Sequence, residues 1–423
     1  MRIRDDKYNR PTLTIEQALA RIIAEVRPKS AETVALADAL GRVSAEDIVS
    51  KEELVPFARS AMDGFAVRAA DTQRASSASP LRMQITGAAY AERGEAQLAP
   101  GTAIAISTGA PLPIGADAVI PIERVRQAEG AVIIAERSAQ GDSVFPAGED
   151  MRRGERIIAR GQLLRAGQIS LLAFAGKSKL RVYRRPRVTI LATGNELVEI
   201  SVRPSHGQIR NSNAPLLLSL AAESGADARF AGVAPDRPAK LKMMLRAAKR
   251  GSDVLLTTGG ASRGERDYVK GALEELGAKF AFRHVAMRPG RPMGFAMWGE
   301  TPVFVLPGNP AAAFVCWHVF VRAAVRKMAG RRDAAAPRMT GKLAGRIHGR
   351  AGMEYAVFAR ATLGEAGLEV TPLENQCSAL VRTAAEANAL AFVPAGKNEL
   401  LPGDAVELQM LDWESAAATQ ESR

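Results

Sequence analysis

Regular alternation of apolar and amphipathic segments across residues 186–330 constrains the fold more than any other feature of the sequence. Apolar runs typical of buried strands occur at 188–192, 229–233 and 253–257, and a segment with helical spacing follows each of them. Asn213 is expected to cap the helix that runs to Gly225, and a hairpin is expected at 293–306. This alternation predicts an α/β domain built on a doubly wound, mostly parallel sheet with helices on both faces.

The segments on either side of this α/β domain have a different pattern of apolar and polar residues. Thr14-Ile-Glu-Gln17 is a capping-box pattern that opens an amphipathic helix, and residues 162–176 also have a helical pattern. Between these helices, short apolar runs separated by Gly, Pro and Asp indicate strands, and short strands return near the C-terminus. The predicted organisation is a helical connecting domain (14–50 and 151–185), an inserted β domain (51–150), the α/β domain (186–334) and a C-terminal small β-barrel (335–413).

Composition narrows the class of protein. The longest apolar run, 311–321, is too short to span a bilayer, and it is expected to be a core helix with a satisfied His318 and with Cys316 as a small hydrophobe. Without an apolar leader, the chain is expected in the cytoplasm and not at a membrane. Cys316 and Cys377 cannot make a disulfide framework, and no histidine pair has zinc-ligand spacing.

The formal net charge of +12 has two interpretations. It is either a solvated basic surface or an attraction for an anionic partner. Nucleic acid is not favoured as that partner, because aromatic residues make up only 5% of the chain and do not interleave with the basic ones. A small anionic substrate fits the charge at least as well.

Four loops follow strands or precede helices of the α/β domain, at the edge where open parallel sheets bind ligands. They span 193–196, 234–237, 258–267 and 307–310. Gly259 and Gly260 let backbone N–H groups approach a phosphate closely, because no Cβ intervenes. The turn Pro307-Gly308-Asn309-Pro310 presents N–H groups at a helix start, which suits an oxyanion such as phosphate or molybdate.

Glu196, Asp236 and Asp267 place three carboxylates on the same rim. Oxygen ligands beside a phosphate site suit Mg²⁺, which proteins hold by one or two carboxylates together with substrate phosphate. Taken singly, the carboxylates have structural explanations: Asp267 caps its helix, and Asp236 begins one. Three carboxylates beside two backbone anion sites favour a functional site instead.

Several long motifs together resemble one known family. In the α/β domain they lie at 193–197, 259–268, 287–292 and 306–310, and in the β domain at 60–66, 107–111 and 148–150. On these motifs the chain resembles the molybdopterin molybdenumtransferase (MoeA) family, which is related to the C-terminal domain of gephyrin. The resemblance extends over about residues 14 to 410 and follows the family's motif order.

The resemblance implies an elongated homodimer of four-domain subunits, with a site between the α/β domain of one subunit and the β domain of the other. It implies Mg²⁺-dependent insertion of molybdate into adenylylated molybdopterin, with release of AMP, in molybdenum cofactor biosynthesis. The catalytic residues implied by motif position are Asp63, Thr108, Asp150, Glu196, Asp236 and Asp267. The residues implied to bind the substrates are Gly259, Gly260, Ser262, Arg288, Arg291, Pro307, Gly308, Asn309, Pro310 and Ser378, with Glu196 and Asp267 holding Mg²⁺.

The chain departs from the family pattern at a few positions. Arg288 and Arg291 stand where lysines are common, and His284 stands where a lysine or arginine is usual. Arginine keeps the charge but changes the geometry, and histidine is neutral at pH 7 when its pKa is unperturbed. Either the anion site is weaker, or the adjacent Arg283 compensates. Phe65 replaces a tyrosine, which predicts the loss of a hydroxyl contact.

Two other functions stay open. A molybdopterin adenylyltransferase shares the α/β domain, but its family usually continues the glycine pair with Thr-Gly, where this chain has Ala261-Ser262, and it lacks the other three domains. A non-catalytic molybdopterin carrier or scaffold is disfavoured by the intact acidic set. The preference between molybdate and tungstate, the oligomeric state and the protein partners, including an adenylyltransferase and a downstream acceptor enzyme, stay open.

Overall fold

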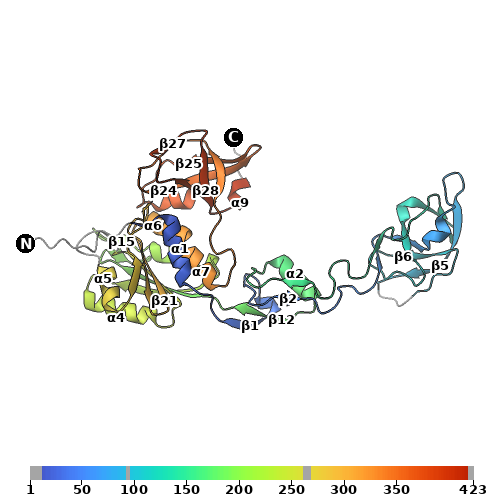
Figure 1. Cartoon of the computed structure of the whole chain (residues 1–423), viewed down its shortest axis with the longest axis horizontal. Helices are drawn as coiled ribbons and strands as arrows, with labels where there is room; N and C mark the ends of the chain where they lie inside the picture. The colour runs from blue at the N-terminus through green and yellow to red at the C-terminus, as the bar shows by residue number, and fades with distance from the viewer. Residues whose placement is uncertain (1–11, 92–95, 261–267, 418–423) are drawn as a thin grey trace, which may run out of the picture.

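The chain is elongated, with a β-rich module at one end and an α/β unit at the other (Figure 1). The computed structural model describes residues 12–91, 96–260 and 268–417. Two extended segments connect the β module to a small unit around helix α2 (Ala166–Phe174), which leads into the α/β unit. A C-terminal barrel sits on one side of the α/β unit. None of the helices in these ranges is long and apolar enough to cross a membrane.

The α/β unit contains a six-stranded sheet in the order β16-β13-β17-β21-β20-β18. Its strands are β16 (Asp227–Ala234), β13 (Arg187–Thr193), β17 (Val254–Thr258), β21 (Thr301–Leu306), β20 (Gly294–Trp298) and β18 (Lys279–Phe282). The first four strands of this order run parallel to one another. Strand β20 runs antiparallel to both of its neighbours, β21 and β18. The predicted mostly parallel sheet and its hairpin are therefore confirmed.

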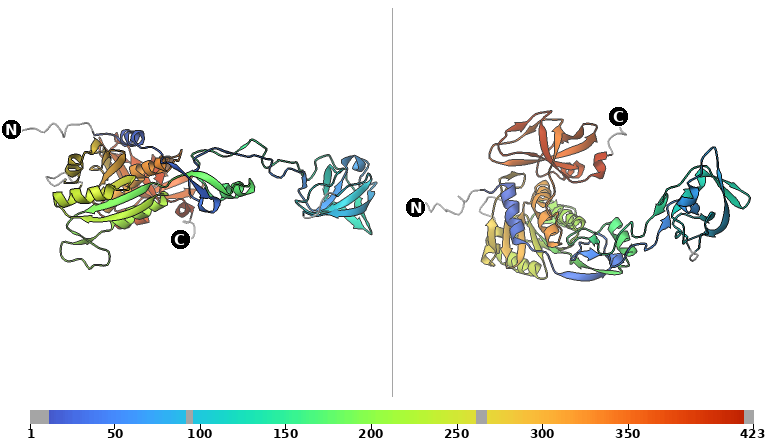
Figure 2. Two further views of the ribbon diagram at one scale, coloured as in Figure 1. Left: turned by 90° about the horizontal axis from the view of Figure 1, so that it is seen from below. Right: turned by 45° about the vertical axis from the view of Figure 1, so that its right-hand side comes forward.

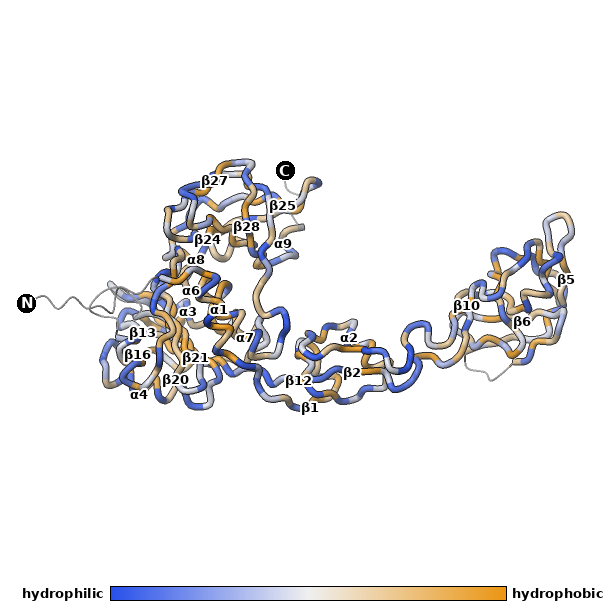
Figure 3. The backbone as a smooth tube through the Cα atoms, in the orientation of Figure 1, coloured by the Kyte–Doolittle hydropathy of each residue, from blue (hydrophilic) through white to orange (hydrophobic). Residues whose placement is uncertain are grey.

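Helices cover both faces of this sheet, because its strands are apolar on both sides. One face packs against α1 (Ile15–Glu25), α3 (Asn213–Glu223) and the helix that runs through α6 (Pro310–Cys316), η5 (Trp317–Val321) and α7 (Arg322–Met328). The other face packs against α4 (Pro238–Lys249) and α5 (Tyr268–Glu275). Phe304 and Val305, adjacent on β21, point into opposite cores. Figure 3 shows hydrophobic segments gathered along β20, β21 and α7.

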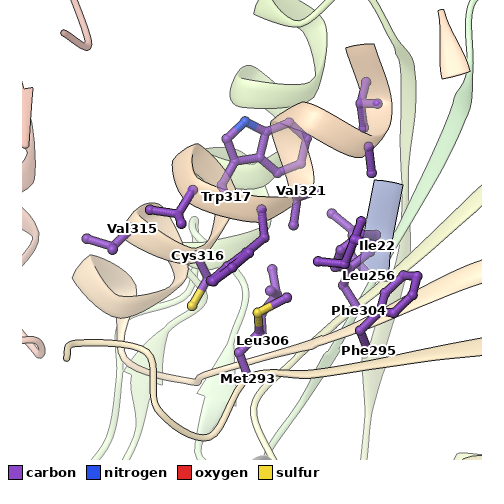
Figure 4. Packing of buried hydrophobic residues seen from close by; sticks show 14 of the residues in the cluster. Ile22, Leu256, Met293, Phe295, Phe304, Leu306, Val315, Cys316, Trp317 and Val321 are labelled. Atoms are coloured by element: carbon purple, nitrogen blue, oxygen red, sulfur yellow. The ribbon is translucent and has the colours of Figure 1, made fainter. Parts of the chain in front are cut away.

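The helix spanning 310–328 begins at the carboxyl end of β21, and its apolar side chains pack against β21 and α1. Its turn at 317–321 has π-helical hydrogen bonding, which inserts an extra residue without ending the helix. Figure 4 shows Cys316, Trp317 and Val321 of this helix packed in one cluster with Leu306 and Phe304 of β21 and with Ile22 of α1. Thr14 forms the predicted capping box of α1, since its Oγ1 accepts the Gln17 N–H at 3.2 Å.

The C-terminal strands close into a barrel with its own core. They are β22 (Met339–Leu343), β24 (Glu354–Gly364), β25 (Gly367–Pro372), β26 (Ala389–Val393) and β28 (Ala405–Met410). The order β24-β25-β22-β28-β26 is closed by pairing of β26 with β24, so the predicted small barrel is confirmed. Strand β19 (Met287–Arg288), from the α/β unit, pairs in parallel with β24 and ties the two units together.

The β module is built on a six-stranded sheet in the order β7-β4-β6-β5-β9-β8. Its strands are β4 (Gly64–Val67), β5 (Leu81–Ala89), β6 (Thr102–Ile106), β7 (Ala118–Pro121), β8 (Val125–Ala128) and β9 (Ala131–Ile134). The small unit between this module and the α/β unit pairs β1 (Ala31–Ala35) with β12 (Lys179–Tyr183) and β2 (Ile48–Val49) with β11 (Arg156–Ile158). This connecting unit therefore combines the predicted helix α2 with strand pairs that the sequence pattern did not indicate.

Candidate functional site

Two glycine-containing loops meet at the carboxyl ends of β13, β17 and β21. Gly259 has φ +93°, and a Cβ there would overlap the Thr193 carbonyl oxygen. A Cβ on Gly308 would lie 3.4 Å from the Cα of Gly259, so the two loops approach closely enough for any side chain at 308 to contact the other main chain. Gly260, at φ +63°, is equally restricted by Val269 and Thr193. The predicted backbone anion sites therefore lie side by side, and glycine is required where the main chains approach each other.

The turn 307–310 begins the helix of α6 as predicted. Asn309 is the N-cap residue and Pro310 occupies the first helical turn. The Asn309 side chain does not cap the helix, and instead its Nδ2 donates to Ser378 Oγ at 3.0 Å. The Ala311 N–H donates to the Ser378 carbonyl at 3.2 Å. The barrel residue Ser378 is thus held against the helix start, although it is far away in sequence.

Two of the three predicted carboxylates lie on neighbouring loops. Glu196 follows β13 and Asp236 follows β16, and both are exposed. Asn195 Oδ1 accepts the Asp236 N–H at 3.2 Å, which ties the two loops together. Ser262 and Asp267 lie outside the described residues. Across the ranges that the structure describes, there is no group of three or more His, Cys, Asp or Glu side chains arranged to hold a metal ion.

A cavity of about 940 Å³ lies between the α/β unit and the barrel. Five of the residues expected to bind substrate line it: Arg288, Arg291, Pro307, Asn309 and Ser378. The barrel adds residues that sequence reasoning missed, namely Arg346, His348, Tyr355, Gln376 and Cys377. Arg346 and His348 flank the buried Ile347, and this alternation marks a strand without showing what the strand faces. No local pattern identifies these residues as part of a site.

The arginines of the 287–292 loop are available to bind an anion. Arg288 is exposed, and Arg291 is half-buried with an Nε that has no hydrogen-bond partner in the described part of the chain. Guanidinium groups bind oxyanions through paired N–H donors. Arg283 does not compensate at this site. It pairs with Glu274 and stacks on the Phe280 ring at 4.8 Å, outside the residues that line the cavity.

The β module brings its own motif segments together. Asp63 Oδ1 accepts the Thr108 N–H at 2.7 Å and the Thr108 hydroxyl at 3.1 Å. The segment before Asp63 is bonded on both sides, since Ser60 N donates to Ala110 O and Ala61 N donates to Ser143 O. Asp150 is exposed further along the third segment, and no hydrogen bond joins it to Asp63 or Thr108. Phe65 is a core residue with 3% exposure, so its ring packs inside the β module, and the predicted loss of a hydroxyl contact stays a prediction.

The β-module residues do not reach the strand ends of the α/β unit within one chain. Figures 1 and 2 agree that the β module and the α/β unit lie at opposite ends, separated by the unit around α2. Asp63, Thr108 and Asp150 are therefore remote from the loop that carries Glu196. The structure divides the predicted site into two parts.

Two sequence predictions about single residues need correction. Asn213 was expected to cap α3, but Asn211 does so, because its Oδ1 accepts the Ala214 N–H at 3.1 Å. His318 is buried as expected but is not satisfied, since neither ring nitrogen has a partner among the described residues. Burial, and then the charges of Arg322 and Arg326, hold the pKa of His318 well below its usual value.

The two cysteines are free and differ in environment. Cys316 is fully buried in the α/β core, and burial raises the pKa of its thiol far above the ordinary value. This confirms the expectation that it packs as a small hydrophobe. Cys377 is exposed and lines the cavity beside Ser378.

Comparison with known proteins gives matches along nearly the whole chain. Three family profiles match: the MoeA N-terminal region (domain I and II) at residues 13–176, the probable molybdopterin binding domain at 189–327, and the MoeA C-terminal region (domain IV) at 340–411. The molybdopterin molybdenumtransferase of Staphylococcus epidermidis is 30% identical over 407 residues, covering 96% of this chain and 97% of that protein. The one from Staphylococcus aureus is 30% identical over 408 residues, with the same coverage.

Solved structures agree with these sequence matches. A molybdopterin biosynthesis MoeA protein from Pyrococcus horikoshii superposes with a TM-score of 0.82 at 27% identity, covering 94% of this chain and all of that one. A second MoeA structure from Pyrococcus horikoshii gives a TM-score of 0.78 at 30% identity, covering 95% of this chain and all of that one. The chain, with its fold, therefore belongs to the MoeA family of molybdopterin molybdenumtransferases.

Proposed function

We propose that this transferase inserts molybdate into adenylylated molybdopterin with release of AMP, in a Mg²⁺-dependent step of molybdenum cofactor biosynthesis. The proposal rests on one observation, which is that segments distant in sequence meet around the cavity between the α/β unit and the barrel. There, the arginine loop, the turn 307–310 and Ser378 of the barrel line one space, and the glycine pair 259–260 adjoins it. The names of the relatives support the same activity.

The reaction brings together two anions, a phosphate-linked pterin and molybdate. Their repulsion is offset by cations and by fixed N–H groups that cost no reorganisation during the reaction. Arg288 and Arg291 supply positive charge on the α/β side of the cavity, and Arg346 supplies it on the barrel side. No covalent nucleophile is required, because holding molybdate beside the dithiolene and the phosphoanhydride supplies much of the rate enhancement.

The residues at the strand ends fit Mg²⁺. Glu196 is exposed on a loop next to that of Asp236, and both offer oxygen ligands, which this hard cation prefers. Glu196 and the sequence-predicted Asp267 are the proposed ligands. Mg²⁺ bound there would offset the charge of the substrate's phosphoryl oxygens. Glu196 would hold the metal at the strand ends, beside the glycine loops.

A homodimer would complete the site. Asp63, Thr108 and Asp150 are separated from Glu196 within one chain, so in this proposal a second copy of the β module supplies them. The Asp63–Thr108 hydrogen bonds keep that acidic group in one orientation for the partner's cavity. The adenylylated pterin itself requires a nucleotidyl transfer upstream, which is the reaction class of a molybdopterin adenylyltransferase.

The test mixes the protein with adenylylated molybdopterin and Mg²⁺ and measures AMP release with and without micromolar molybdate. The expected result is molybdate-dependent release that falls at least about 100-fold in Glu196→Gln and is abolished by EDTA. Glu199→Gln, at an exposed glutamate just after β14 (Leu197–Val198), is the matched control and should keep full activity. Tight pterin binding without AMP release under any condition would contradict the transferase proposal and indicate a carrier.

A further inference from the structure

Asn213 connects the two loops that carry the backbone anion sites. It is the first residue of α3 and only 7% exposed. Its Nδ2 donates to Thr258 Oγ1 at 2.7 Å and to the Gly308 carbonyl at 2.7 Å. Thr258 Oγ1 in turn donates to the Pro307 carbonyl at 3.1 Å. One side chain therefore bridges the end of β17 and the turn after β21.

The hydrogen-bond acceptors determine which atom of the Asn213 amide faces Thr258 and Gly308. A backbone carbonyl can only accept, so the atom that faces Gly308 O must be the amide nitrogen. The Thr258 hydroxyl uses its single proton on Pro307 O, and it therefore accepts from Asn213. Both protons of the Asn213 amide are committed to these two loops. Flipping the amide would leave two oxygens in contact and break the chain of bonds.

The bridge is not a requirement of α3 itself. Asn211 already supplies the helix cap through Ala214, so the Asn213 side chain is free of any capping role. Asn213 Oδ1 is buried and has no partner in the part of the chain that the structure describes, and the same is true of the Thr193 hydroxyl beneath Gly259 and Gly260.

We infer that Asn213 is a positioning residue for the reaction proposed above. It sets the spacing between the glycine pair 259–260 and the turn 307–310, so that N–H groups from both loops meet one bound substrate. A Cβ at position 308 would lie only 3.4 Å from the Cα of Gly259, so the loops run close together, and among the described residues outside them Asn213 is the one whose side chain bonds to both. This role rests on the proposed function and assigns to Asn213 no contact with the reacting atoms.

Substitution of Asn213 by alanine removes both of its bonds and leaves the Thr258–Pro307 bond to hold the two loops together, which loosens their spacing. The expected result is a rise in the Kd for AMP and a fall in kcat/KM for the adenylylated pterin, each by about 10- to 100-fold, since small misplacements of substrate-binding groups have effects of this size. Thr258→Val removes the two bonds of the Thr258 hydroxyl, to Asn213 and to Pro307 O, and keeps the Asn213 bond to Gly308. Its effect should have the same direction.

The matched control is Asn388→Ala. Asn388 is also buried, at 5% exposure, and its side chain makes two hydrogen bonds to the backbone of Ala361, but it lies in the barrel and does not line the cavity. This variant should lower the melting temperature while leaving the AMP affinity and KM unchanged. Equal losses of melting temperature in the two variants, with wild-type AMP affinity and KM in both, would overturn the positioning role of Asn213.

Direct AMP titration by calorimetry separates this inference from the proposed function. A wild-type protein that binds AMP but shows no molybdate-dependent release contradicts the transferase activity, and the Asn213→Ala titration still decides whether Asn213 positions the loops. A weaker AMP affinity in Asn213→Ala and in Thr258→Val, but not in Asn388→Ala, supports the inference. If the wild-type protein neither binds nor releases AMP, both proposals fail.

Discussion

The side-chain amide of Asn309 lies 3.0 Å from the hydroxyl of Ser378, which joins the start of the long helix in the α/β unit to the C-terminal barrel. A second bond, from the Ala311 N–H to the Ser378 carbonyl, lies directly behind it. These contacts hold the barrel wall of the cavity in register with the turn 307–310. The cavity lies where the α/β unit meets the barrel, and these polar contacts add to the shared apolar packing and to the β19–β24 pairing that join the two units.

Ser378→Ala should reduce turnover with little effect on stability. The exposed Asn309–Ser378 bond contributes about 1 kcal/mol, so kcat/KM is expected to fall about fivefold if that energy is used to align the two walls. The measurement is steady-state AMP release together with thermal unfolding. Ser205→Ala, at another exposed serine, is the control. Unchanged kinetics in Ser378→Ala would show that the barrel is held by the backbone contacts alone.

Arg288→Gln should weaken binding of molybdate, because it removes a guanidinium that lines the cavity. We expect the KM for molybdate to rise at least about tenfold, with Arg288→Lys intermediate because a lysine keeps the charge but not the paired donors. Arg283→Gln is the comparison, since Arg283 is engaged by Glu274 and Phe280. An equal rise in KM for both glutamine variants would indicate a general charge effect and not a site.

Asp253→Asn should destabilise the α/β unit at neutral pH by about 2 kcal/mol, because it removes the charge-assisted bonds between a buried carboxylate and partly exposed cations. Asp253 accepts hydrogen bonds from Arg184 and Arg187 and is 6% exposed. Burial by itself raises the pKa of this carboxyl, but the bonds from Arg184 and Arg187 outweigh burial and hold the pKa well below its usual range. Urea unfolding at pH 7 measures the loss, and Asp227→Asn, at an exposed position, is the control.

The lowered pKa of the Asp253 carboxyl also predicts how the free energy of unfolding depends on pH. Its pKa is lower in the folded state than in the unfolded state, so its stabilisation is present above the unfolded value of about 3.9. The stabilisation is lost as the pH falls below that value toward the folded pKa. The difference in unfolding free energy between wild type and Asp253→Asn should therefore be constant from pH 7 to about pH 5 and shrink below about pH 4. A difference that grows on acidification would contradict this account.

Alkylation of the native protein should modify one thiol. Cys377 is exposed at the cavity, whereas Cys316 is buried and its pKa is raised far above the ordinary value, so little reactive thiolate exists there. Mass spectrometry after treatment with N-ethylmaleimide should find a single adduct, which disappears in Cys377→Ser and forms more slowly when substrate fills the cavity. Two adducts on the folded protein would show that the core around Cys316 opens.

Much of the fold was predictable because its signals are local. The Thr14–Gln17 capping box, the apolar strands of the α/β unit and the glycines at their ends depend on backbone preferences and on short-range periodicity. The prediction for Asn213 failed for a related reason. Its local pattern favours a cap, but the carbonyl of Gly308 and the hydroxyl of Thr258 supply better partners from distant segments.

The residues on the barrel side of the cavity were not predictable, because nothing near Arg346 or Tyr355 in the sequence records which surface faces them. The lack of hydrogen-bond partners for His318 among the described residues was not predictable either, since an apolar helix pattern indicates burial but not hydrogen-bond partners. By itself, the sequence determined the strand–helix order, the glycine loops and the family motifs, because each is encoded by residues close together in the chain. Only the tertiary structure decided that Asn309 meets Ser378 and that Asp63 lies far from Glu196, because packing of separate cores brings some distant segments together and holds others apart.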